Sequence, residues 1–114
     1  MPGQTYSTPT YDIRKVDPDA CVADATWDAA DAARQAASAH AIAAKHPTDD
    51  DTRRAARRVQ KHADAAAEVA KQAAEENKAE RPNLRKIHAC AGYAEHHRNQ
   101  AAAIAKSMQE NNRS

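Results

Sequence analysis

Alanine is the feature that most limits what this chain can fold into. It supplies 30 of the 114 residues, and all of them lie between positions 20 and 105. Alanine has the highest helix propensity of the common residues. The chain has no phenylalanine and only two glycines, a composition that is not typical of a β-sheet. The sequence therefore predicts an all-α fold.

An alanine core gains little free energy from burial. A buried CH₂ group contributes roughly 0.8 kcal/mol, whereas a whole leucine side chain contributes about 1.5–3 kcal/mol. The large aliphatic side chains that could supplement it are few: Ile13, Val16, Val22, Ile42, Val59, Val69, Leu84, Ile87, Ile104 and Met108. A further stabilising element is therefore expected, such as an oligomer interface, a disulfide or a metal ion.

Charge and hydropathy argue against several classes of partner. The 17 basic and 16 acidic side chains nearly cancel, so no attraction to nucleic acid or to a membrane surface is implied. The basic run at 53–58 has no interleaved aromatic residue and is expected to be a solvated face. No signal-like or membrane-spanning apolar segment occurs, so the cytoplasm is the expected location.

Turn and capping residues divide the chain into an arm and three long helices. Residues 1–16 show no periodicity and are expected to form an extended or disordered arm. Asp17 and Pro18 mark the start of a helix over 17–46. Thr48 and Asp51 form a variant of the capping box for a second helix over 49–78, and a third is expected over 83–110. Short loops favour an antiparallel bundle, in which a fourth or further helix would come from an extra element or from oligomerisation.

Helical phase predicts which side of the first helix is buried. At 100° per residue, Ala33 and His40 fall on the apolar side and Asp28 on the polar side. Trp27 and Ile42 also fall on the polar side. These two residues indicate a second interface, either with the arm or with another copy of the chain, unless they are isolated exposed side chains.

The third helix carries one cysteine and three histidines within ten positions, 88–97. Cys90 and His97 fall on its apolar face, whereas His88 and His96 face solvent. Residues that lie at one level in antiparallel helices have numbers with a constant sum. A loop centred near 80–81 therefore places His62 opposite residue ~99, within one turn of His97. The sequence predicts two histidines that face each other across a seam of alanines.

The remaining candidate ligands lie further from this pair. Cys90 and His97 are separated by ~10 Å along the helix axis, so a single ion does not easily contact both. Cys21 is expected within about a turn of Cys90, either as a thiol or in a disulfide, although a cytoplasmic chain keeps its thiols reduced. His40 reaches the histidine pair only if the register shifts.

The second helix contains the segment RRAARRVQKHADAA, residues 53–66. It resembles the RRC-x-R-x₄-CAD-x-C segment of the cysteine-rich four-helix-bundle copper storage proteins. Identical residues are Arg53, Arg54, Arg57, Ala63 and Asp64, while the cysteine positions hold Ala55, His62 and Ala66. The family's C-x₃-C-x₂-C-x₃-C spacing corresponds in the third helix to Cys90, Ala94, His97 and Ala101.

This resemblance implies a divergent or engineered relative whose metal site is reduced to His62, Cys90 and His97, with Cys21 as a further candidate. The chain differs from the family in having two cysteines and no fourth helix, so storage of many copper ions is not expected.

Three functions remain open at this point. The first is a small metal-binding protein for copper or zinc, because imidazole and thiolate suit both metals. Its ligands would be His62 and His97, with Cys90, Cys21 and His40 in second rank. The second is a metal-free protein-interaction module that uses Trp27, Ile42 and the N-terminal tyrosines. The third is a metalloenzyme with open coordination positions, although no general base is apparent. Equally, the two histidines can bond to each other and bind nothing.

Overall fold

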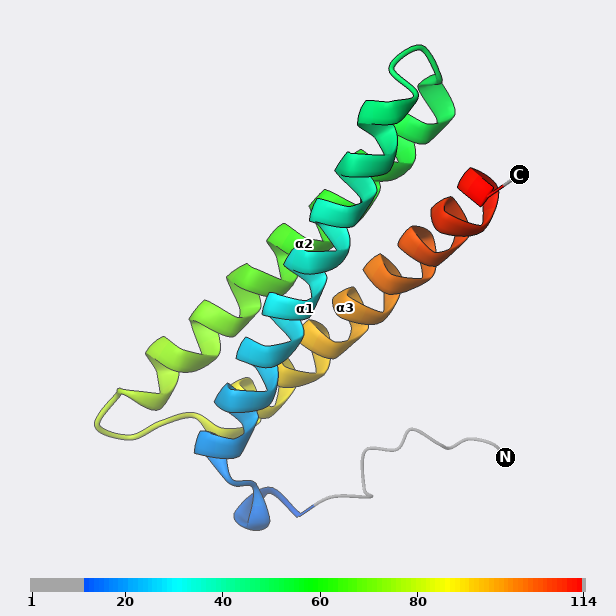
Figure 1. Ribbon diagram of the computed structural model, residues 1–114. Helices are drawn as coiled ribbons and strands as arrows, with labels where there is room; N and C mark the ends of the chain where they lie inside the picture. Colours follow the sequence, from blue (N-terminus) through cyan, green and yellow to red (C-terminus); the bar gives the residue numbers. More distant parts are fainter. Residues whose placement is uncertain (1–11, 114) are drawn as a thin grey trace.

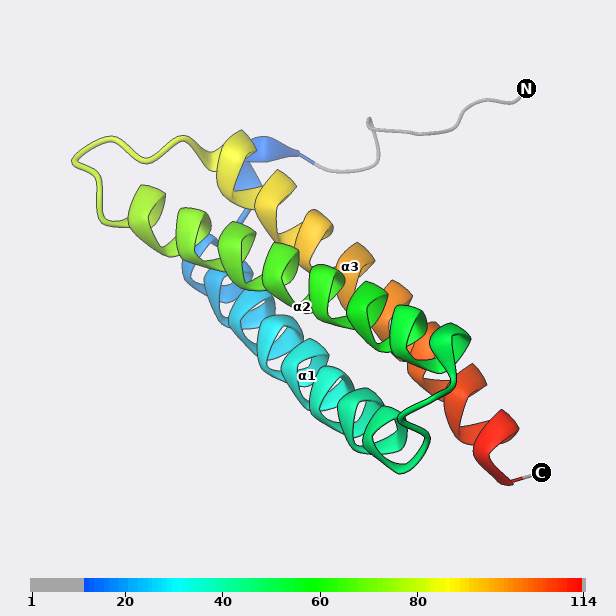
Figure 2. The same cartoon turned by 90° about the horizontal axis from the view of Figure 1, so that it is seen from above.

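Three helices make up most of residues 12–113, the part of the chain that the structure, a computed structural model, describes. A short 3-10 helix, η3 (Ile13–Lys15), precedes α1 (Pro18–Lys45), α2 (Asp50–Asn77) and α3 (Leu84–Arg113). Consecutive helices run in opposite directions and all three pack against one another (Figure 1 and Figure 2). The predicted all-α bundle of three helices is confirmed, and each predicted helix end lies within three residues of the observed one.

The predicted N-terminal arm is described only in part. Ile13–Lys15 forms the short helix η3 within it, and residues 1–11 lie outside the described residues. No helix in the described part of the chain is long and apolar enough to cross a membrane.

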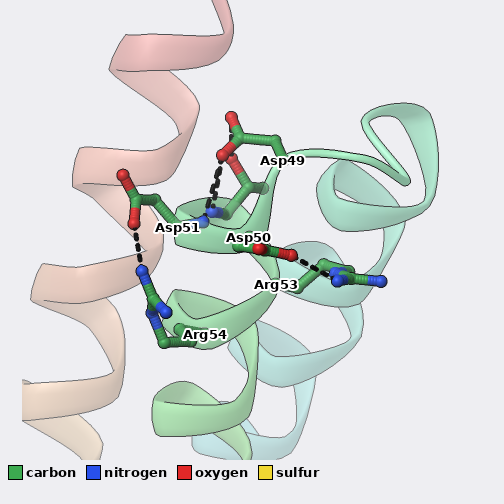
Figure 3. Close-up of polar contacts among 6 residues, drawn as sticks. Asp49, Asp50, Asp51, Arg53 and Arg54 are labelled. Carbon is green, nitrogen blue, oxygen red and sulfur yellow. Dashed lines mark hydrogen bonds and ion pairs between the residues drawn. The ribbon is translucent and has the colours of Figure 1, made fainter.

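Aspartate side chains cap the first two helices. Oδ1 of Asp17 accepts hydrogen bonds from the backbone N–H groups of Asp19 and Ala20. At α2 the cap is Asp49, whose Oδ1 accepts from the N–H groups of Asp51 and Thr52 (Figure 3). The predicted capping box at Thr48 is therefore wrong by one residue. A carboxylate is the stronger acceptor here, because a negative charge also interacts favourably with the positive end of the helix dipole.

The core is built almost entirely from small side chains. Its fully buried members include Ala32, Ala66 and Ala101, one from each helix. The largest fully buried side chains are Ile87 and Val59. Side-chain size sets the distance between packed helices, so alanine seams allow the three backbones to approach closely. Four larger side chains, Ile42, Val59, Ile87 and Met108, are buried among the alanines.

The predicted buried face of α1 needs correction. Ile42 was expected on the polar side, but it is only 8% exposed and belongs to the core cluster that contains Ala39 and Met108. It is therefore not available for an oligomer interface. Ala33 was expected in the core but is exposed, and Asp28 was expected on the polar side but is buried. Since alanine occurs on every side of α1, the distribution of apolar and polar residues does not show which face of this helix is buried.

Asp28 is buried because it has a partner on another helix. Its Oδ1 accepts from Nε of Arg98 on α3 at 3.3 Å, and Asp31 lies 3.6 Å from the same Nε. The guanidinium groups of Arg98 and Arg34 lie 5.6 and 5.8 Å from the ring centroid of Trp27. Trp27 remains 57% exposed. The α1–α3 contact thus contains a paired charge beside an exposed aromatic ring.

Candidate metal site

His62 of α2 and His97 of α3 are in direct contact. Their Nδ1 atoms lie 3.0 Å apart and their ring centroids 5.2 Å apart, with an angle of 37° between the ring planes. Both side chains are half-buried. The sequence predicted these residues within one turn of each other, and the contact is confirmed.

Alanines on both helices make room for this contact. Ala63 and Ala66 are buried next to His62, and Ala94 and Ala101 are buried one turn to either side of His97. The rings therefore lie at the edge of the α2–α3 seam, where they are only partly shielded from water.

This environment favours neutral imidazoles. Burial lowers the pKa of His62 from its ordinary value of 6.5, and electrostatic interactions with His96 and Arg58 lower it further. Burial also lowers the pKa of His97, with additional contributions from His62 and His96. Of two neutral rings in contact, the Nδ1–H group of one donates a hydrogen bond, which the unprotonated Nδ1 of the other accepts.

These pKa shifts predict that acid destabilises the bundle. Because both folded-state pKa values lie below 6.5, the unfolded chain binds more protons as the pH falls past that value. The contribution to stability is therefore complete above the unfolded pKa of about 6.5. It is lost as the pH decreases through the lower folded-state values. Urea melts between pH 8 and pH 5 measure this loss.

A double His62→Gln, His97→Gln variant provides the comparison, because glutamine keeps a polar side chain but does not titrate. Its melts are expected to depend less on pH across the same range. His40→Gln is the matched control and is expected to keep the wild-type profile. Equal slopes for the wild type and the double variant would contradict the assignment of this titration to the pair.

The structure does not bring the other candidate ligands to the pair. Cys90 is buried in a cluster with Ala73 and Ile87, and Cys21 packs against the same cluster. Both cysteines are free thiols, and burial raises the pKa of each. The predicted proximity of the two cysteines is thus supported, but they lie in a different cluster from the histidines. A raised pKa keeps the thiols protonated at neutral pH, which disfavours metal binding.

His40 is not on the buried face of α1, contrary to the prediction. It is exposed, and its Nε2 lies 3.0 Å from Oε1 of Gln60 on α2. Among residues 12–113, no group of three or more histidine, cysteine, aspartate or glutamate side chains could hold a metal ion. Any metal at the pair would therefore have two ligands from the described chain.

The donor spacing of the pair suits a metal ion. A tetrahedral ion with imidazole nitrogens at about 2.0–2.1 Å holds two of them about 3.3 Å apart. The observed 3.0 Å requires only a small outward movement of the rings. His96 lies beside His97, with the two rings edge to face and their centroids 5.3 Å apart, but it is exposed. The pair therefore fits an ion with open coordination positions.

Comparison of the chain with protein-family models, curated proteins and solved structures found no match. The resemblance to the copper storage proteins stays a prediction from the residues quoted above. The geometry of His62 and His97 is accordingly the basis for any functional assignment.

Proposed function

We propose that the protein binds one copper or zinc ion between Nδ1 of His62 and Nδ1 of His97. The observation that carries the proposal is the 3.0 Å contact between these two atoms, which come from different helices. Both rings have a lowered pKa, so neutral imidazole, the form that coordinates metal, is favoured at neutral pH.

A metal ion can bind the lone pairs of both Nδ1 atoms, which a shared proton cannot do. A proton satisfies one nitrogen as donor and the other as acceptor, whereas a metal ion accepts both lone pairs. Each Nε2 then carries its proton and can donate it to water or to a neighbouring group. The remaining coordination positions are open to water or to a ligand from solution.

The surrounding charge favours a singly charged ion. Arg58 acts electrostatically on His62, and its positive charge opposes a divalent ion more strongly than a monovalent one. Imidazole suits both copper and zinc. Cu(I) is therefore the preferred ion and Zn(II) the second, in a protein that we place in the cytoplasm.

The test is a metal titration of untagged protein in competition with a chromophoric chelator, paired with thermal melts. One ion per chain is expected to bind and to raise the melting temperature, because a ligand of the folded state stabilises that state. His62→Ala and His97→Ala are each expected to weaken binding at least tenfold, which corresponds to about 1.4 kcal/mol.

His40→Ala serves as the matched control, since His40 is an exposed histidine outside the pair. It is expected to bind metal as the wild type does. Unchanged affinity in both His62→Ala and His97→Ala, with circular dichroism showing that they are folded, would overturn the proposal.

A second candidate function is a metal-free interaction module that includes self-association. The observation that favours it is the exposure of two large aromatic side chains, Trp27 and Tyr93, because exposed tryptophan and tyrosine are enriched at protein interfaces. Sedimentation at increasing concentration tests self-association. Trp27→Ala is expected to reduce it if this candidate holds, and to leave metal affinity unchanged.

A further inference from the structure

A cavity of about 520 Å³ lies at the end of the bundle where the α1–α2 connection meets the last turns of α3. Ile42, Ala55, Ile104 and Met108 form its apolar side, with at least one residue from each helix. This volume falls within the range of small-molecule sites, which are lined mainly by apolar groups with a few polar ones. The metal candidates His62 and His97 do not line it.

Three charged side chains line the same cavity, and two of them already have partners. Asp49 uses Oδ1 for the backbone of α2, and its Oδ2 accepts from the hydroxyl of Thr52. Asp51 is paired with Arg54, as Figure 3 shows. Both carboxylates therefore already have polar partners within the protein.

Arg58 is the third charged residue of the lining. Within the described chain it makes no hydrogen bond or ion pair, and it acts electrostatically on His62. A guanidinium has five N–H donors and binds a carboxylate through two parallel hydrogen bonds. The charge that lacks a partner in this cavity is therefore positive.

The far side of the cavity, on α3, offers neutral polar groups. Ser107 and Asn111 line it there. His46 and Asn112 also line the cavity, and Nε2 of His46 lies 2.7 Å from Oδ1 of Asn112, which connects the end of α1 to the end of α3. The cavity thus combines an apolar surface, one unpaired cation and neutral hydrogen-bonding groups.

We infer that this cavity binds a small monocarboxylic acid with an alkyl chain. The carboxylate pairs with the guanidinium of Arg58, and the chain lies against Ile42, Ile104 and Met108. Such a ligand removes apolar surface from water and gives Arg58 a partner that it lacks among residues 12–113. No residue of this cavity is a ligand in the metal proposal, but Arg58 also acts electrostatically on His62, so the test below uses metal-free protein.

Octanoate is the probe, titrated into metal-free protein with chelator present, so that the result does not depend on the metal site. ¹H–¹³C correlation NMR spectra monitor the methyl groups of Ile42, Ile104 and Met108. These signals are expected to shift in a saturable way with octanoate. Octylammonium and octanol, which have the same chain without the negative charge, are expected to bind at least tenfold more weakly.

Arg58→Gln removes the charge from an exposed position and is expected to weaken octanoate binding at least tenfold. Arg57→Gln is the matched control, because Arg57 is also exposed on α2 but lies outside this cavity. It is expected to change the affinity less than twofold. The inference is overturned if octanoate fails to bind, if octanol or octylammonium binds equally well, or if Arg58→Gln has no effect.

Discussion

Replacement of Ile87 by alanine is expected to lower the free energy of unfolding by about 3 kcal/mol. Ile87 is fully buried in a cluster with Ala73 and Cys90. Small neighbours leave few side-chain atoms that could move into the space, so most of the cavity would persist. A typical domain has a stability of about 5–15 kcal/mol. This single change therefore removes a large part of the stability.

Urea denaturation followed by far-ultraviolet circular dichroism measures this effect. Ile104→Ala is the matched control, since the side chain of Ile104 is only half-buried at the cavity end of α3. A loss of about 1 kcal/mol is expected there, because less apolar surface returns to water. Similar losses for the two variants would contradict the view that a few large side chains dominate the stability of this core.

The helices could be predicted because their ends are encoded locally. Asp17 with Pro18 at the start of α1 carries a capping signal that does not depend on tertiary structure. The cap of α2 was misplaced by one residue, because Thr48 and Asp49 are both good capping residues and only the backbone geometry separates them. Asp49 supplies the capping oxygen.

The buried face of α1 could not be predicted in the same way. It packs against two helices, and Ala33 and Ala36 have identical side chains although only Ala36 is buried. The distinction depends on contacts with other helices. Asp28 shows this most clearly, since its burial depends on Arg98, which lies 70 residues later in the chain.

The histidine pair was predictable because short loops fix the register of antiparallel helices. His62 and His97 therefore met as expected, whereas His40, on α1, was assigned to the wrong face. Arg58 was missed as a binding candidate, because it belongs to a run of arginines that was expected to be solvated throughout. The pairing of Asp51 with Arg54 is local, three residues apart on one helix. Only the tertiary structure shows that Arg58 lines a cavity.

Replacement of Asp28 by alanine is expected to lower the free energy of unfolding by about 2 kcal/mol. Removal of one partner of a buried ion pair leaves the other charge without compensation, at about 3–5 kcal/mol for a fully buried pair. Arg98 is partly exposed and also lies near Asp31. Water and Asp31 would therefore offset part of the loss.

A double-mutant cycle with Asp28→Ala and Arg98→Ala separates the pair interaction from the other effects of each change. The double variant is expected to be more stable than the sum of the single losses predicts, because neither charge is then left unpaired. Asp24→Ala is the matched control, since Asp24 is exposed on the same helix, and a change within about 0.5 kcal/mol is expected there. Strictly additive losses in the cycle would show that Asp28 is buried without coupling to Arg98. The α1–α3 register would then not depend on this ion pair.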